Sequence, residues 1–120
     1  MGGYSNENSD TFCKELLETG DPQEVREWIY QGDSSLGELP HDESVALAEK
    51  IYQAGAVHLY GVEIEEIDPQ TKNTGRLVVE LPANAQQRKR VLDWAAGVAH
   101  EQGFDAESDV GQQYVFVMLD

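Results

Sequence analysis

Residues 56–67, AVHLYGVEIEEI, decide the fold class, because here a predicted helix gives way to the first clear β-strand. Strand side chains alternate between two faces, and the first half of this stretch separates into two pairs: Val57 with Leu59, and His58 with Tyr60. Beyond Gly61 the alternation of apolar residues changes phase. A glycine at a change of phase is typical of a β-bulge. We therefore predict a strand with a bulge or a sharp bend at or beside Gly61.

The segments around this strand predict an antiparallel sheet with helices on one face. Residues 43–55 have the wide apolar arc of an amphipathic helix, and residues 68–75, DPQTKNTG, have the composition of a hairpin loop. A second strand, RLVVELP, a long helix that ends at Gly103 and a final strand, QQYVFVMLD, follow. The order is helix, strand, strand, helix, strand. We predict an α+β fold with a ferredoxin-like or truncated ferredoxin-like αββαβ core over residues 43–120.

The N-terminal third predicts a helical hairpin that is joined to this core by a linker. We expect residues 1–8 to be disordered. The stretch TGDPQE ends one helix and starts another, with Glu24 in the capping box of the second. The hairpin spans residues 9–32, and residues 33–42, with two serines, one glycine and one proline, form the linker. With the core, these segments make a single domain over residues 9–120.

The predicted sheet has one face that the core helices cover and one that they do not. Alternation assigns five apolar side chains to the covered face: Val57, Leu59, Leu77, Val79 and Leu81. The second face collects aromatic and apolar side chains, which are the candidate binding residues: His58, Tyr60, Val78, Tyr114 and Phe116. An uncovered patch of this kind marks an interaction site on a monomer.

Three explanations for the second face remain open at this point. The N-terminal helix pair folds back over it and buries Trp28, Phe12 and Leu16. A homodimer forms through it. A ligand or a partner protein binds it.

The charge of the chain restricts the partners that it can attract. The 120 residues include 23 acidic and 8 basic side chains, which gives a formal net charge of −15. Such a field repels polyanions, so we expect no binding to nucleic acid or to anionic membranes. Cys13 is the only cysteine, as is typical of a protein from a reducing compartment. The N-terminus lacks the features of a signal peptide, and we expect a cytoplasmic protein.

The tripeptide RKR is the exception to the acidity and holds three candidate anion-binding or salt-bridge residues: Arg88, Lys89 and Arg90. Arg88 falls within the apolar arc of its helix. We predict that it pairs with a carboxylate at the sheet edge, with Glu80 as one candidate. No glycine-rich loop precedes this helix to support phosphate binding.

The residues that could carry metal or acid–base chemistry lack the surroundings that such chemistry needs. The acids beside His41 favour the start of a helix without any metal. The stretch DAESDVG, residues 105–111, begins like a calcium loop but has Val110 where that loop needs glycine. A histidine between apolar neighbours, as His58 is, more often packs than catalyses. We predict no metal and no cofactor.

These features favour a small acidic protein that works by binding. We expect a non-enzymatic protein-interaction or regulatory module whose partner is another protein or a second copy of the chain. One alternative is a small-metabolite-sensing domain of the ferredoxin-like type. A second alternative is a small hydrolase or isomerase that uses His58 with a nearby carboxylate. Fold alone does not choose between these classes.

Overall fold

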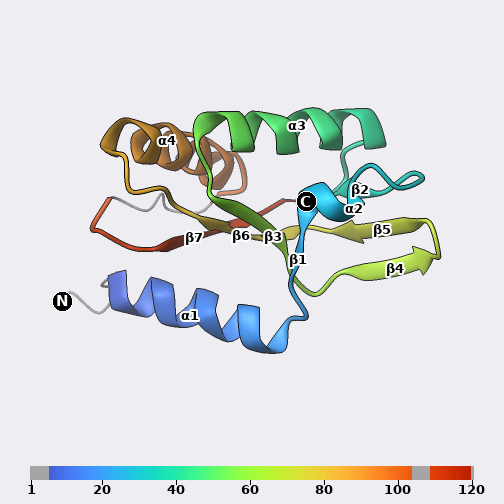
Figure 1. The fold of residues 1–120 in the computed structure, drawn as a ribbon, viewed down its shortest axis with the longest axis horizontal. Coiled ribbons are helices and arrows are strands. Elements are labelled where there is room, and N and C mark those ends of the chain that lie inside the picture. Colours follow the sequence, from blue (N-terminus) through green and yellow to red (C-terminus); the bar gives the residue numbers. More distant parts are fainter. Residues whose placement is uncertain (1–5, 104–108, 120) are drawn as a thin grey trace.

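Residues 6–103 and 109–119 are described by the computed structural model, and they form a mixed α+β protein, as predicted (Figure 1). The elements are α1 (Asn6–Thr19), β1 (Gln23–Glu24), α2 (Val25–Trp28), β2 (Ser35–Leu36), α3 (His41–Ala54), β3 (His58–Gly61), β4 (Glu65–Asp68), β5 (Thr71–Thr74), β6 (Arg76–Glu80), α4 (Ala85–Glu101) and β7 (Tyr114–Met118). The predicted disorder over residues 1–8 falls mostly outside the described residues, but α1 begins earlier than expected, at Asn6.

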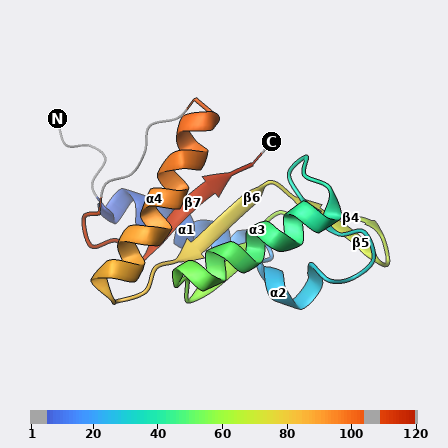
Figure 2. The ribbon, with the colours of Figure 1, turned by 90° about the horizontal axis from the view of Figure 1, so that it is seen from above.

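The strands form two sheets. The larger has the order β1-β3-β6-β7, and every neighbouring pair in it is antiparallel. The smaller has the order β2-β5-β4 and lies beyond one end of the larger, where β4 and β5 extend away from α4 (Figure 2). Antiparallel pairing of β3 with β6 and of β6 with β7 agrees with the predicted sheet.

The order of the larger sheet differs from the predicted ferredoxin-like topology. In a split βαβ unit a helix connects parallel strands, with another strand inserted between them. Here α4 connects β6 to β7, which are adjacent and antiparallel. The connection after α4 brings the chain back to the end of β6, where the Leu81 N–H donates to the Gln113 carbonyl (2.8 Å). The helices and the three main strands follow the predicted order, but β4 and β5 form additional strands between β3 and β6, and β7 runs antiparallel to β6.

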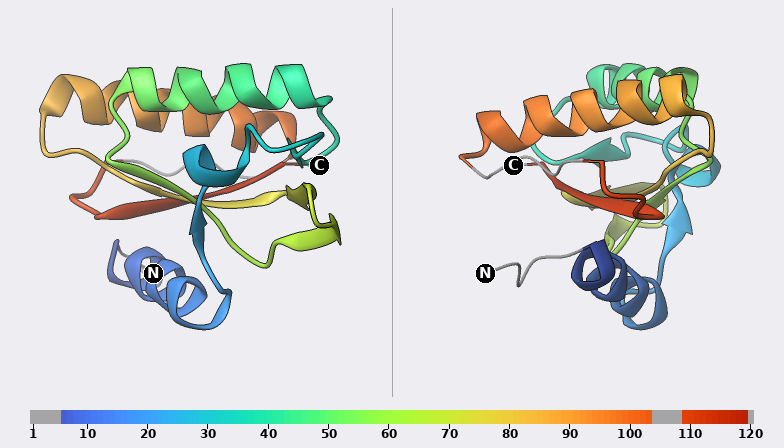
Figure 3. Two further views of the ribbon diagram at one scale, coloured as in Figure 1. Left: turned by 45° about the vertical axis from the view of Figure 1, so that its right-hand side comes forward. Right: turned by 90° about the vertical axis from the view of Figure 1, so that its left-hand side faces the viewer.

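Helices α3 and α4 cover one face of the larger sheet, and the main core lies beneath them (Figures 1 and 3). Four of the five side chains predicted for this face lie in the core: Leu59, Leu77, Val79 and Leu81. The fifth prediction, Val57, was wrong, because 44% of this residue is exposed. Val57 lies in the short connection between α3 and β3, where no helix covers it.

The opposite face of the larger sheet lies against α1, which runs below β7 in Figure 1. Cys13, Val62 and Val78 are fully buried here and form a second, smaller core. Leu16 and Leu17 of α1 pack against it. Helices therefore lie on both faces of the sheet: α3 and α4 on one face, as predicted, and α1 on the other.

The predicted helical hairpin over residues 9–32 does not form. Its second helix is a single turn, α2, and the preceding residues form the edge strand β1, in which Glu24 lies opposite Tyr60. Glu24 is extended, with φ −62° and ψ 126°, and does not cap α2 with its side chain. Trp28 joins the main core under α3 and not the core under α1. Pairing with β3 thus outweighed the local capping signal.

Two segments that were predicted to be loops contribute strands to the smaller sheet. The predicted linker contains β2, which pairs in parallel with β5, and the predicted hairpin loop 68–75 contains β5. The Asn73 side-chain amide donates to the Ser35 and Gly37 carbonyls (3.3 and 2.9 Å) and ties the two strands together. The polar, turn-forming composition of these segments hides a pairing that depends on long-range hydrogen bonds.

The predicted bend near Gly61 occurs two residues later, at Glu63. Pairing of β3 with β6 is regular through Gly61, and Glu63 has a φ of 53°. Val62 belongs to the core under α1, whereas Ile64 packs against the core under α3 and α4, so the change of phase falls between them. Gly61 has a different role: a Cβ there would lie 2.9 Å from Thr74 Cγ2 and 3.0 Å from Trp28 Cζ2.

Candidate functional site

The five predicted binding residues come from three neighbouring strands. Four of them, Tyr60, Val78, Tyr114 and Phe116, gather in the core under α1, and the His58 ring stacks on Tyr60 with 5.3 Å between the ring centroids. The Phe116 ring meets Phe12 of α1 edge-on at 5.2 Å. The first of the three open explanations, cover by N-terminal residues, therefore holds in part: α1 covers this face through Leu16, but Trp28 lies in the other core and Phe12 is 47% exposed. Binding by these five residues stays a prediction.

His58 also belongs to a polar cluster around Glu24, which the sequence did not predict. Its Nδ1–H donates to Glu24 Oε1 at 2.6 Å, because a carboxylate can only accept. Glu24 Oε2 accepts from the Tyr52 hydroxyl (2.6 Å) and from the Leu59 N–H (3.0 Å). The Arg26 guanidinium lies 3.7 Å from the centre of the Tyr52 ring. Three segments of the chain, β1, α3 and β3, meet at this carboxylate.

Burial and hydrogen bonding set the charges of this cluster. Burial alone would raise the pKa of Glu24, but the hydrogen bonds from Tyr52, Leu59 and His58 together lower it. Burial and the hydrogen bond to Glu24 raise the pKa of Tyr52 to about 12. The Glu24 side chain is 15% exposed and that of His58 is 43% exposed. The cluster thus presents an oriented, accessible imidazole beside a fixed anion.

The cluster has one chemical capability beyond stability. A carboxylate that holds Nδ1–H fixes the tautomer of a neutral histidine and leaves the other ring nitrogen able to accept a proton. The enzyme alternative for His58 requires a nearby carboxylate, and Glu24 lies in that position, while the activity itself stays a prediction. Sequence reasoning missed Glu24 and Tyr52 because each had a simpler interpretation, as a capping residue and as part of an apolar helix arc.

A groove with a volume of about 510 Å³ lies between α3 and α4. Its apolar lining comes from five half-buried side chains of separate segments: Leu39, Leu47, Trp94, Val98 and Leu119. Charged side chains also line it: Lys50 from α3, and Asp93 and Glu101 from α4. Leu47, Trp94 and Val98 belong to the apolar faces of α3 and α4, and local periodicity does not show that a groove opens between the two helices.

Gly97 lies in the wall of this groove, within the last two turns of α4. Glycine in a helix is about 1 kcal/mol less favourable than alanine. A Cβ at Gly97 would meet no atom within 4 Å, so no close contact inside the described chain requires a glycine there. The missing side chain leaves open space in the groove.

A second depression, of about 340 Å³, lies by the smaller sheet and has a polar lining that includes Glu63, Asn73 and Arg76. Arg76 and Glu63 form an exposed ion pair across it. It lacks the large apolar side chains that line the groove between α3 and α4.

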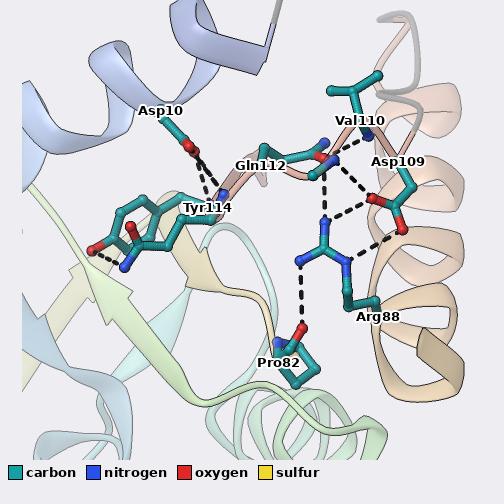
Figure 4. A network of polar contacts seen from close by, with 9 residues as sticks. Asp10, Pro82, Arg88, Asp109, Val110, Gln112 and Tyr114 are labelled. Carbon is teal, nitrogen blue, oxygen red and sulfur yellow. Dashed lines mark hydrogen bonds and ion pairs between the residues drawn. The ribbon is translucent and has the colours of Figure 1, made fainter. Parts of the chain in front are cut away.

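The three basic residues of RKR separate in the structure. Arg88 pairs with Asp109 through its Nη2 (2.7 Å) and its Nε (3.3 Å), and its Nη1 donates to the Pro82 carbonyl (Figure 4). The predicted partner Glu80 was therefore wrong, because the segment after α4 brings a nearer carboxylate to the helix. Lys89 pairs with Asp93 one turn along, and Arg90 is exposed.

The same region anchors α1 to the sheet. The Asp10 carboxylate accepts from the N–H groups of Gln113 and Tyr114 at 3.0 Å, at the start of β7 (Figure 4). Buried Gln112 accepts from the Val110 N–H (2.9 Å) and from Arg88 (3.4 Å). Most of the calcium-like stretch 105–111 lies outside the described residues, but its Asp109 has this structural partner.

The described residues offer neither a metal-binding cluster nor a membrane-spanning helix. Among the side chains that the structure describes, no three metal-ligating groups converge on one point. Among the helices that the structure describes, none has the length and apolarity to cross a membrane. Comparisons of the chain with protein-family models, with curated proteins and with solved structures give no match, so its function is argued from its own geometry.

Proposed function

We propose that this chain is a non-enzymatic protein-interaction module and that the groove between α3 and α4 is its binding surface. The observation that carries the proposal is the convergence of five half-buried apolar side chains, including Trp94, in one groove. Tryptophan is enriched among the residues that dominate binding energy at interfaces. A groove between two helices also suits a segment of a partner protein.

The charge of the chain supports a protein partner in a reducing, cytoplasmic setting. A net charge of −15 opposes approach to nucleic acid and to anionic lipid. The same charge speeds the approach of a basic protein, and that effect weakens with salt. The one cysteine, Cys13, is buried and forms no disulfide.

A peptide selection tests this proposal. Random peptides displayed on phage are selected on the intact chain, and the affinities of enriched peptides are measured by calorimetry. Gly97→Gln should abolish their binding, because the new side chain extends into the groove from a position with open space around it. Ile67→Gln, at an exposed apolar residue of β4, is the control and should bind as the wild type does. Enriched peptides that tolerate Gly97→Gln, or a selection without enrichment, would contradict the proposal.

A second candidate function, a small hydrolase or isomerase, is favoured by the 2.6 Å hydrogen bond that orients His58 on Glu24. An oriented histidine is the usual general base of such enzymes. Activity found in a panel of ester, amide and keto–enol substrates should disappear in His58→Ala and fall strongly in Glu24→Gln. Activity that persists in His58→Ala would remove this candidate.

Metabolite sensing is a third candidate, because a volume of about 510 Å³ lies in the range of small-molecule sites. A metabolite that binds the folded chain and not the unfolded chain raises its Tm, and the rise grows with the ratio of metabolite concentration to Kd. A rise that Gly97→Gln removes would favour sensing through the groove over binding of a protein segment.

A further inference from the structure

We infer that the occupant of the groove is a basic amphipathic helix of a partner protein and that its backbone crosses α4 at Gly97. This inference rests on the proposed function, which it makes specific. Three observations lead to it: the unexplained glycine, the shape of the groove and the charges around it.

Gly97 differs from the other glycines in helix or sheet surroundings. A Cβ at Gly20 would lie 2.6 Å from the Leu16 carbonyl oxygen, and Gly61 faces Trp28 and Thr74 just as closely, so the fold itself requires both. At Gly97 nothing lies within 4 Å, although the residue is inside a helix that alanine would favour. Gly97 is exposed, and close approach of another backbone is one of the uses that a missing Cβ permits.

The shape of the groove suits a helix. Its walls are two helices, α3 and α4, which lie on the same side of the sheet (Figure 2). Val98 follows Gly97 directly, and Trp94 lies one turn before it. These two side chains flank the open space along α4. A helix laid between them would bury an apolar stripe against Trp94, Val98 and Leu47 and pass closest to α4 at Gly97.

The charges around the open space favour a basic occupant. Glu101 lies one turn beyond Gly97. Asp93, one turn before Gly97, is already paired with Lys89 (2.6 Å), so Glu101 carries the negative charge that this wall offers to an occupant. The C-terminal end of α4, which carries the negative pole of the helix dipole, lines the groove with Gln102. Lys50 on the opposite wall is the single basic residue in the lining, and it would pair with an acidic residue on the far edge of the bound helix.

Synthetic helices provide the test with the intact chain. The probe is a peptide of about 18 residues, or about 27 Å as a helix, made of leucine at helical spacing and lysine elsewhere. Two further peptides replace lysine with glutamate or with glutamine. Trp94 fluorescence reports binding in the groove, because Trp28 is buried in the core and insensitive to it.

The lysine peptide should shift the Trp94 emission to shorter wavelength and bind at least about tenfold more tightly than the other two. Gly97→Ala should weaken its binding by about tenfold or more and Gly97→Leu further, while both variants keep or raise the Tm. This separation of affinity from stability would not arise from a structural role. Gln86→Ala, at an exposed position outside the groove on the same helix, should change neither.

Charge is tested separately on the same peptide. Glu101→Gln should weaken the binding, whereas Glu15→Gln, which makes the same change on exposed α1, should leave it nearly unchanged. A lysine peptide that binds Gly97→Ala as tightly as the wild type would overturn the close approach. Equal or tighter binding of the glutamate or glutamine peptide would overturn the basic occupant and leave the proposed function standing. A lysine peptide without effect on Trp94 would overturn this inference, while the phage selection decides the proposed function by itself.

Discussion

The carboxylate of Glu24 accepts hydrogen bonds from Tyr52 on α3 and from His58 and Leu59 on β3. These bonds outweigh burial and keep its pKa below the usual 4.5. Because the folded pKa is lowered, its contribution to stability is complete above pH 4.5 and is lost as the pH falls through the folded pKa. The raised pKa of Tyr52 affects stability at high pH, because an ionised phenol would lie beside the Glu24 anion.

Tyr52→Phe should remove part of the stability loss at high pH. The pKa of Tyr52 is about 12 in the folded chain and 10 when unfolded, so the unfolded state releases its proton first and stability declines as the pH rises from 10 to about 12. The variant should lose about 1 kcal/mol at neutral pH, the value of one hydrogen bond. Urea unfolding across this pH range measures both effects. If the free energies of unfolding of the wild type and of Tyr52→Phe changed in parallel from pH 8 to 12, Tyr52 would not titrate as described.

The same substitution at two glycines should change stability in opposite directions. Gly61→Ala forces a methyl group against Trp28 and Thr74, both buried, and should cost about 1–3 kcal/mol. Gly97→Ala meets open space and should add up to about 1 kcal/mol. Thermal unfolding of the two variants measures this. If both glycines proved equally intolerant, the open space at Gly97 would be filled by something else.

At the scale of elements, the sequence predicted what local pattern determines. Periodicity found α3, α4, β3, β6 and β7, and alternation assigned Leu77 and Val78 to opposite cores. Sequence patterns failed where a residue distant in the chain determines the local structure. Glu24 has the pattern of a capping residue, but pairing with Tyr60 makes it part of a strand. Residues 71–74 are turn-like in composition and become β5 through Ser35 and Leu36. The groove was missed for the same reason, because its walls meet only in three dimensions.

Helix α1 depends on one polar anchor and on a small apolar contact. Asp10 accepts from two N–H groups at the start of β7, and Cys13 is the only fully buried side chain that α1 contributes among its described positions. Asp10→Ala should weaken the docking of α1 by about 1.4 kcal/mol, and the buried Cys13 thiol should then react with a thiol reagent about ten times faster. Stopped-flow labelling at low reagent concentration measures that rate.

Glu15→Ala is the matched control for this experiment, because it removes the same charge from an exposed position on α1. Its labelling rate should stay within about twofold of the wild type. Equal rates in all three proteins would show that α1 is held by its apolar face alone.

At the scale of the whole molecule, helices cover both faces of the larger sheet, while one of its edges stays open. The Leu81 and Leu119 N–H groups bond across to Gln113 and Gly75, so the odd-numbered residues of β7 face β6. Phe116 and Met118 consequently turn their backbone groups to the outer edge, where no other strand of the described residues lies. Such an edge is a site for pairing between copies of a chain unless something opposes it. Here the net charge of −15 opposes such pairing, because two copies of the chain repel each other.

Light scattering should therefore find a monomer at neutral pH and low salt over a wide range of concentrations. Near pH 4.3, where the net charge vanishes, repulsion is lost and the mass should rise with concentration. Met118→Pro removes an outward N–H that the sheet does not use, so it should fold normally and stay monomeric near pH 4.3. If Met118→Pro associates as the wild type does, the contact lies elsewhere than β7. A dimer already present at neutral pH would mean that an attractive surface outweighs the repulsion between two strongly acidic chains.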